Sequence, residues 1–123
     1  MTFNPGDVVT VDFPYVAGIE RRPAVVLSSS IYHTIRPDVI VGLITSQTTA
    51  LGATDYVLQD WAASGLRVAS VFRSFIVTLP PSANLILIGH LSERDWTGVR
   101  ACVKVALVEL NDPTPSSDRS SSP

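Results

Sequence analysis

A chain of 123 residues, of which 46% are hydrophobic and 16% charged, is long enough to bury the core of one ordinary domain. This composition excludes a globally disordered chain, and a net charge of −2 excludes an overall basic field that would attract nucleic acid. A nucleic-acid partner would therefore have to bind a local patch. Eight of the nine basic residues are arginines, whose planar guanidinium groups suit phosphate oxygens, although a lineage bias would give the same count.

The first 90 residues are typical of a chain of short β-strands. Strands are expected at 7–13, 23–30, 38–46, 56–58, 68–79 and 86–89. The first strand alternates, with Val9, Val11 and Phe13 on one face, whereas 38–46 is apolar on both faces and should be central. We expect a bend in 68–79 around Arg73, a loop at 14–21 and a turn at 80–82.

The C-terminal part of the chain predicts one amphipathic helix over residues 92–109. Ser92 and Asp95 resemble a capping box, and six apolar residues follow at helical spacing. Gly98 disfavours a helix by about 1 kcal/mol relative to alanine, so another part of the chain should approach closely there. Short strands followed by one helix favour a β-barrel with the helix packed against it.

Residues 111–123 contain three prolines, five serines and no apolar residue, which predicts a disordered tail after a folded domain of residues 1–110. The single cysteine, Cys102, excludes a disulfide within the chain, and its apolar neighbours indicate a buried side chain rather than a nucleophile. No run of roughly 18 apolar residues could span a membrane, and residues 1–5 do not resemble a signal peptide. We therefore expect a cytoplasmic protein.

Three polar clusters at predicted strand ends are the candidates for chemistry: residues 20–23, residues 45–49, and Arg73 within an apolar strand. Each has an ordinary structural interpretation. Arg21 could be a solvated loop charge, the hydroxyl run could satisfy a turn, and Arg73 could pair with Asp12 or Asp55. His33 and His90 do not have metal-ligand spacing, and no glycine-rich phosphate loop is present, so we expect no metal and no cofactor.

Five segments share their order and spacing with a known family. They are GDVV-VDF within 6–13, RPAVVLS at 22–28, ITSQ at 44–47, GL followed by SVFR within 65–73, and IGHLS at 88–92. Together they resemble the PemK/MazF-like toxins of type II toxin–antitoxin systems over about residues 6–110. The resemblance implies a mainly β fold, an SH3-like barrel of the CcdB/MazF type with a C-terminal helix, which usually forms a homodimer.

The resemblance also implies an activity. Members are metal-independent, sequence-specific endoribonucleases that cut single-stranded RNA, including mRNA, and each is paired with a cognate antitoxin. The ribose 2′-hydroxyl attacks the adjacent phosphate and leaves a 2′,3′-cyclic phosphate and a 5′-hydroxyl. Such cleavage needs a base, an acid and positive charge on the developing phosphorane.

The matching motifs imply catalytic roles for three residues. Arg22 would bind the phosphate and stabilise the transition state, Thr45 would hydrogen-bond the scissile phosphate, and Glu20 would be the base, unless it merely neutralises Arg21. Substrate contacts are expected from Arg21, Ser46, Gln47 and Arg73.

One position departs from the family pattern. Some members have an aspartate two residues after the strand arginine, whereas this chain has Phe75. Two alternatives to the nuclease stay open, and Phe75 is evidence for the second of them. One is a non-catalytic toxin that binds a protein through its C-terminal helix, as the related gyrase inhibitors do. The other is a decayed toxin retained as an interaction partner.

Overall fold

The computed structural model describes residues 2–49 and 51–107. It contains six strands, two α-helices and one 3-10 turn, which confirms a mainly β fold with a C-terminal helix. In chain order the elements are β1 (Asp7–Tyr15), β2 (Gly18–Val26), α1 (Ser30–Ile35), β3 (Val39–Thr45), β4 (Asp55–Val57), β5 (Val71–Leu79), η1 (Pro81–Ala83), β6 (Ile86–His90) and α2 (Glu93–Ala106). The predicted tail, and with it the domain boundary after residue 110, lies outside the described residues.

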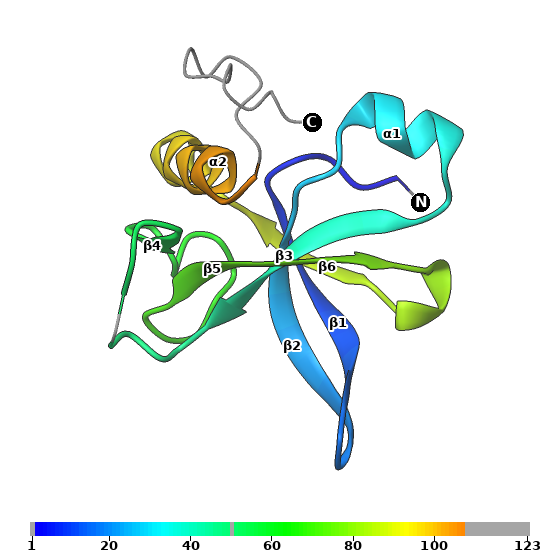
Figure 1. Ribbon diagram of the computed structural model, residues 1–123, viewed down its shortest axis with the longest axis horizontal. Helices are drawn as coiled ribbons and strands as arrows, with labels where there is room; N and C mark the ends of the chain where they lie inside the picture. The colour runs from blue at the N-terminus through cyan, green and yellow to red at the C-terminus, as the bar shows by residue number, and fades with distance from the viewer. Residues whose placement is uncertain (1, 50, 108–123) are drawn as a thin grey trace, which may run out of the picture.

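The strands form one antiparallel sheet in the order β4-β5-β3-β2-β1-β6 (Figure 1). β1 and β5 are separated in this order by two other strands, yet the rings of Phe13 and Phe75 lie edge to face with centroids 5.7 Å apart. The sheet must therefore curl strongly to bring them together, as in a barrel. The register between β3 and β5 shifts between Gly42 and Ile44, opposite Arg73, so the predicted bend is confirmed.

The core consists of two apolar clusters that take alternate residues from the same strands. Val9 and Val11 belong to one cluster and Val8 to the other, as expected for an alternating strand. The central strand β3 likewise contributes Leu43 to the first cluster and Ile44 to the second. The second cluster also contains Val99 and Cys102 of α2, so the C-terminal helix closes that side of the sheet.

The loop predicted at 14–21 is wrong. β1 and β2 continue to Tyr15 and Gly18, which pair with each other and leave a turn of only two residues, 16 and 17. Pro14 is tolerated within β1 because β6 pairs with this strand only over Asp7–Thr10, so the outer edge of β1 is unpaired at Pro14. The consequence for the site is that Glu20, Arg21 and Arg22 lie on a regular strand rather than in a loop.

The strand predicted at 23–30 ends at Val26, and α1 follows, which the sequence did not predict. The side chain of Ser29 accepts a hydrogen bond from the amide of Tyr32, 3.1 Å away, and caps this helix. Ser29 and Ser30, which were predicted to end a strand, therefore begin a short helix.

Helix α2 begins as predicted. The Ser92 side chain accepts from the amide of Asp95 at 3.2 Å. A Cβ atom at Gly98 would overlap the Tyr56 ring, which is the close neighbour that the sequence predicted. The helix ends at Ala106, three residues before the predicted end. Burial raises the pKa of the Cys102 thiol, in keeping with a packing role for this residue.

Candidate functional site

A cleft of about 640 Å³ lies between β2, the end of β3 and residues 65–68. Of the seven predicted site residues, five line this cleft: Glu20, Arg21, Arg22, Thr45 and Ser46. Gln47 and Arg73 are not among the lining residues. The cleft thus brings together two polar clusters that are more than 20 positions apart in sequence.

Arg22 and Thr45 come together through the pairing of β2 with β3. Ala24 pairs with Leu43, and Arg22 and Thr45 each lie two residues beyond this last pair of the antiparallel ladder. Glu20 lies two residues before Arg22 on the same face of β2, and its Oε1 is 3.5 Å from Arg22 Nη1. The sheet therefore presents a cation, a hydroxyl and a carboxylate together in the cleft at the end of β3.

Arg21 also lines the cleft, but its guanidinium group is already engaged. Its Nη1 lies 2.6 Å from Asp12 Oδ1, and its Nη2 donates to the hydroxyl of Thr10 at 2.7 Å. Arg21 is therefore not a solvated loop charge. The expected neutralisation of Arg21 by Glu20 is also wrong, because Glu20 pairs with Arg22 and Asp12 pairs with Arg21.

Thr45 has a structural role as well as a place in the cleft. Its Oγ1 accepts a hydrogen bond from the amide of Gln47 at 3.1 Å, so the turn interpretation of the hydroxyl run is confirmed at this residue. That bond uses the oxygen as an acceptor and leaves the hydroxyl hydrogen as a donor. The same turn that satisfies the chain thus holds the Thr45 hydroxyl in one orientation.

Arg73 lies beside the segment that follows β3. Its Nη1 is 2.9 Å from Asp55 Oδ2, and its Nη2 donates to the carbonyls of Gln47 and Thr49 at 3.2 and 3.3 Å. The structure confirms Asp55 as its ion-pair partner, which was one of the two alternatives. These contacts tie β4 and β5 to the segment that carries Ser46, so Arg73 is placed to hold the wall of the cleft.

Sequence reasoning missed one charged residue of the cleft. Arg67 is exposed, lines the cleft, and forms no ion pair or hydrogen bond with the residues that the structure describes. It sits in the irregular segment between β4 and β5, where neither periodicity nor a motif marks it. Only the three-dimensional path of the chain brings it to the cleft.

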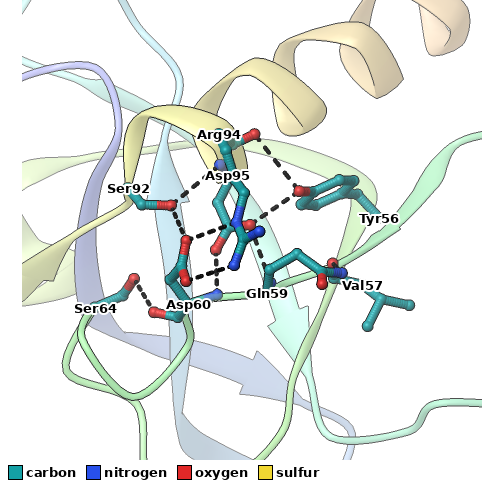
Figure 2. Close-up of polar contacts among 8 residues, drawn as sticks. All are labelled: Tyr56, Val57, Gln59, Asp60, Ser64, Ser92, Arg94 and Asp95. Carbon is teal, nitrogen blue, oxygen red and sulfur yellow. Dashed lines mark hydrogen bonds and ion pairs between the residues drawn. The ribbon is translucent and has the colours of Figure 1, made fainter.

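The segment between β4 and β5 is fixed to the start of α2 by a polar network (Figure 2). Asp95 is fully buried and accepts hydrogen bonds from the Tyr56 hydroxyl at 2.9 Å and from the amides of Gln59 and Asp60 at 3.0 and 2.8 Å. Asp60 in turn accepts from Ser92 at 2.6 Å and from Arg94 at 2.9 and 3.0 Å. Both carboxylates therefore anchor the segment.

The contacts of the network shift the pKa values of Tyr56 and Asp60. Burial, followed by the hydrogen bond to Asp95, raises the pKa of Tyr56 to about 12. Hydrogen bonds from Arg94 and then from Ser92 lower the pKa of the Asp60 carboxyl. At neutral pH, Tyr56 is therefore a stable donor and Asp60 a stable acceptor.

Within residues 2–49 and 51–107, no group of three or more histidine, cysteine, aspartate or glutamate side chains could hold a metal ion. Over the same part of the chain, no helix is long and apolar enough to cross a membrane.

Comparison with known proteins gives one family. A family model described as a PemK-like, MazF-like toxin of type II toxin–antitoxin system matches residues 4–107. No curated protein matches the chain.

Solved structures with the same fold come from several bacteria. A MazE–MazF structure (form III) from Deinococcus radiodurans superposes with a TM-score of 0.71 at 20% identity, covering 86% of this chain and 96% of the other. An endoribonuclease in complex with its cognate antitoxin, from Mycobacterial species, gives 0.72 at 18% identity and covers 93% and 100%. The Mycobacterium tuberculosis toxin MazF-mt6 gives 0.61 at 23% identity and covers 79% and 94%. These likenesses confirm the MazF-type fold.

Proposed function

Since the chain belongs to the PemK-like, MazF-like family of type II toxin–antitoxin toxins, we propose that it is a metal-independent, sequence-specific endoribonuclease acting on single-stranded RNA. The observation that carries the proposal is the cleft in which Arg22, Thr45 and Glu20 lie together. A single strand suits such a site because its unstacked bases expose the edges that a protein reads.

In the proposed reaction, the 2′-hydroxyl attacks the adjacent phosphorus, and the bond to the 5′ oxygen breaks. Glu20 takes the proton of the 2′-hydroxyl, and the departing 5′ oxygen takes a proton from solvent water. Arg22 stabilises the charge that builds on the phosphorane oxygens, and Thr45 donates its hydroxyl hydrogen to one of them. The products are a 2′,3′-cyclic phosphate and a 5′-hydroxyl.

Phe75 supplies no proton-transfer group to this reaction. Its ring is half exposed and packs against Phe13, so an apolar side chain occupies the position where some family members have aspartate. Glu20 Oε1 lies 3.5 Å from Arg22 Nη1, whereas Asp12 is engaged by Arg21. This difference favours Glu20 as the base.

We further propose a homodimer in the cytoplasm, controlled by a cognate antitoxin. Large apolar side chains such as Val16, Ile19, Ile31 and Ile35 are exposed in the single chain, and a second copy or an antitoxin would cover part of this surface. The Deinococcus radiodurans relative is a MazE–MazF structure, and the mycobacterial one is a complex with its cognate antitoxin, which supports a partner of that class.

Cleavage should not depend on a divalent cation, because the proposal assigns the stabilising charge to Arg22. Purified protein incubated with a long single-stranded RNA in excess EDTA should give discrete fragments on a denaturing gel. Activity that returns only with added Mg²⁺ or Mn²⁺ would refute this mechanism. Intact RNA, together with growth arrest on expression, would instead favour a toxin that acts by binding a protein.

Glu20→Gln should lower cleavage roughly 10²-fold and remove the acidic limb of the pH–rate profile, because glutamine cannot accept the proton. The measurement is the single-turnover rate across the pH range for the wild-type and variant proteins. If Glu20 only balances the charge of Arg22, the rate should stay near the wild-type value and RNA should bind more tightly. An acidic limb that persists in the variant would exclude Glu20 as the base and turn attention to Asp12.

A further inference from the structure

We propose that Arg67 forms a second phosphate site in the cleft, which binds the backbone of a nucleotide adjoining the scissile phosphate. The inference rests on the proposed endoribonuclease function and adds to it a second contact in the cleft that contains Arg22. No motif of the sequence marks Arg67, so the argument depends on charge and on the path of the chain.

The charges of the cleft favour Arg67 as a phosphate ligand. Three arginines and one glutamate line the cleft. Arg21 is paired with Asp12 at 2.6 Å, and Arg22 lies 3.5 Å from Glu20. Arg67 is exposed and has no ion-pair partner among the residues that the structure describes. An anion that enters the cleft therefore meets at Arg67 a guanidinium group without a competing carboxylate.

The backbone that carries Arg67 is held on the β6 side. Gly65 has a φ of +92°, and a Cβ atom there would overlap the carbonyl of Ile88 in β6. Gly89 makes the reciprocal close approach, because a Cβ atom at that position would overlap the carbonyl of Ser64. Only glycine allows the two backbones to lie this close, so the start of 65–68 is pressed against β6.

The chain that leads into this segment is held by the network of Figure 2. Asp95 accepts from the amides of Gln59 and Asp60, and the Ser64 hydroxyl donates to the carbonyl of Asp60 at 3.0 Å. The backbone leading to Arg67 is thus anchored to α2 and to β6 at once. A guanidinium group on an anchored backbone loses less conformational freedom when it binds phosphate.

The geometry suits a single-stranded ligand. Arg22 of β2 and Arg67 of residues 65–68 both line the cleft, so a chain that carries one phosphate per nucleotide can contact both with different phosphates. Because Arg67 would not touch the reacting atoms, its removal should weaken binding and leave the chemical step intact. A phosphate contact also has its own signature, since each one adds to the salt dependence of binding.

The test compares Arg67→Ala with the wild-type protein on an RNA carrying the sequence that the wild type cuts. A 2′-deoxy nucleotide at the cut prevents cleavage. The variant should bind about tenfold more weakly at low salt, and the slope of log K against log salt should fall by about 0.7, the contribution of one single-strand phosphate. On cleavable RNA, the single-turnover rate at saturation should stay within about twofold of wild type.

Two further variants provide the controls. Arg67→Lys should keep most of the salt slope, because it keeps the charge. Arg36→Ala removes another exposed arginine, paired with Asp38 and lining a different pocket, and should change neither affinity nor slope. Unchanged melting temperatures would show that each variant is folded. If Arg67→Ala does not fold, Arg67→Gln takes its place in the same measurements.

The outcomes separate this inference from the proposed function. A wild-type protein that cuts RNA, with an Arg67→Ala variant of equal affinity and slope, would overturn the inference and leave the proposed function standing. A large loss of rate at saturation with unchanged affinity would also overturn it, by placing Arg67 in the chemistry. A wild-type protein that neither binds nor cuts RNA would overturn both.

Discussion

Arg22→Ala should lower kcat for RNA cleavage by about 10²-fold or more, equivalent to about 3 kcal/mol of transition-state stabilisation. Arg22 lies with Thr45 in the cleft, where charge would develop on the phosphorane oxygens. Arg22→Lys should restore only part of the rate, because an ammonium group cannot form the bidentate contact. Thr45→Ala should also impair cleavage, and single-turnover rates on one RNA would measure all three.

Arg21→Ala is the matched control, since the two arginines are adjacent and line the same cleft but have different ion-pair partners. Arg21 is engaged by Asp12 and Thr10, so its loss should affect the rate much less than the loss of Arg22. Equal damage from the two substitutions would mean that the roles within this pair are wrongly assigned. Circular dichroism of each variant would establish that the fold is intact.

Asp95→Ala should destabilise the protein by about 3 kcal/mol. The substitution removes the acceptor of the Tyr56 hydroxyl and of two backbone amides at a fully buried position, and each unsatisfied donor costs on the order of 1 kcal/mol or more. In a domain of this size, the melting temperature should fall by roughly 10–20 °C, as measured by thermal unfolding. Glu93→Ala, at an exposed position in the same helical turn, should change stability by no more than about 1 kcal/mol.

The pH dependence of stability offers an independent check on this network. The pKa of Tyr56 is raised to about 12, so the protonated hydroxyl favours the folded state. The stabilisation is fully present below about pH 10, where tyrosine in the unfolded chain is also protonated, and is lost as the pH rises through about 12. Asp95→Ala should reduce this alkaline loss; an identical pH dependence in the two proteins would contradict the role given to the pair.

Much of the fold could be predicted because local patterns agree with the tertiary structure. The alternation of Val9 and Val11, the double-sided apolar run of β3 and the Ser92 cap are each decided by neighbours close in sequence. The hairpin at 14–21 was not predicted, because Pro14 and Gly18 are turn signals that here fit an unpaired strand edge and a two-residue turn. Turn signals in the sequence could not show that the outer edge of β1 lacks a paired strand at Pro14.

The candidate site was predictable only in part, for a similar reason. Arg22 and Thr45 belong to motifs with a fixed place on β2 and β3, and the register of these strands brings them together. The bend at Arg73 was predicted, but its contacts with the carbonyls of Gln47 and Thr49 depend on a segment 24 to 26 residues earlier in the sequence, which no local pattern brings to it. Arg67 reaches the cleft because Asp95, 28 residues later in the sequence, and the Gly65–Gly89 approach fix the intervening chain.

The most direct test of the central claim is the chemistry of the RNA ends formed in EDTA. Long single-stranded RNA would be treated with the wild-type protein and with Arg22→Ala, and the 5′-hydroxyl ends would be mapped by sequencing. Cuts at one short sequence are predicted for the wild type, with 5′-hydroxyl and 2′,3′-cyclic phosphate ends, and a matching loss of cuts for Arg22→Ala. Ends carrying 5′-phosphate, or equal cutting by both proteins, would contradict cleavage through Arg22 and the 2′-hydroxyl.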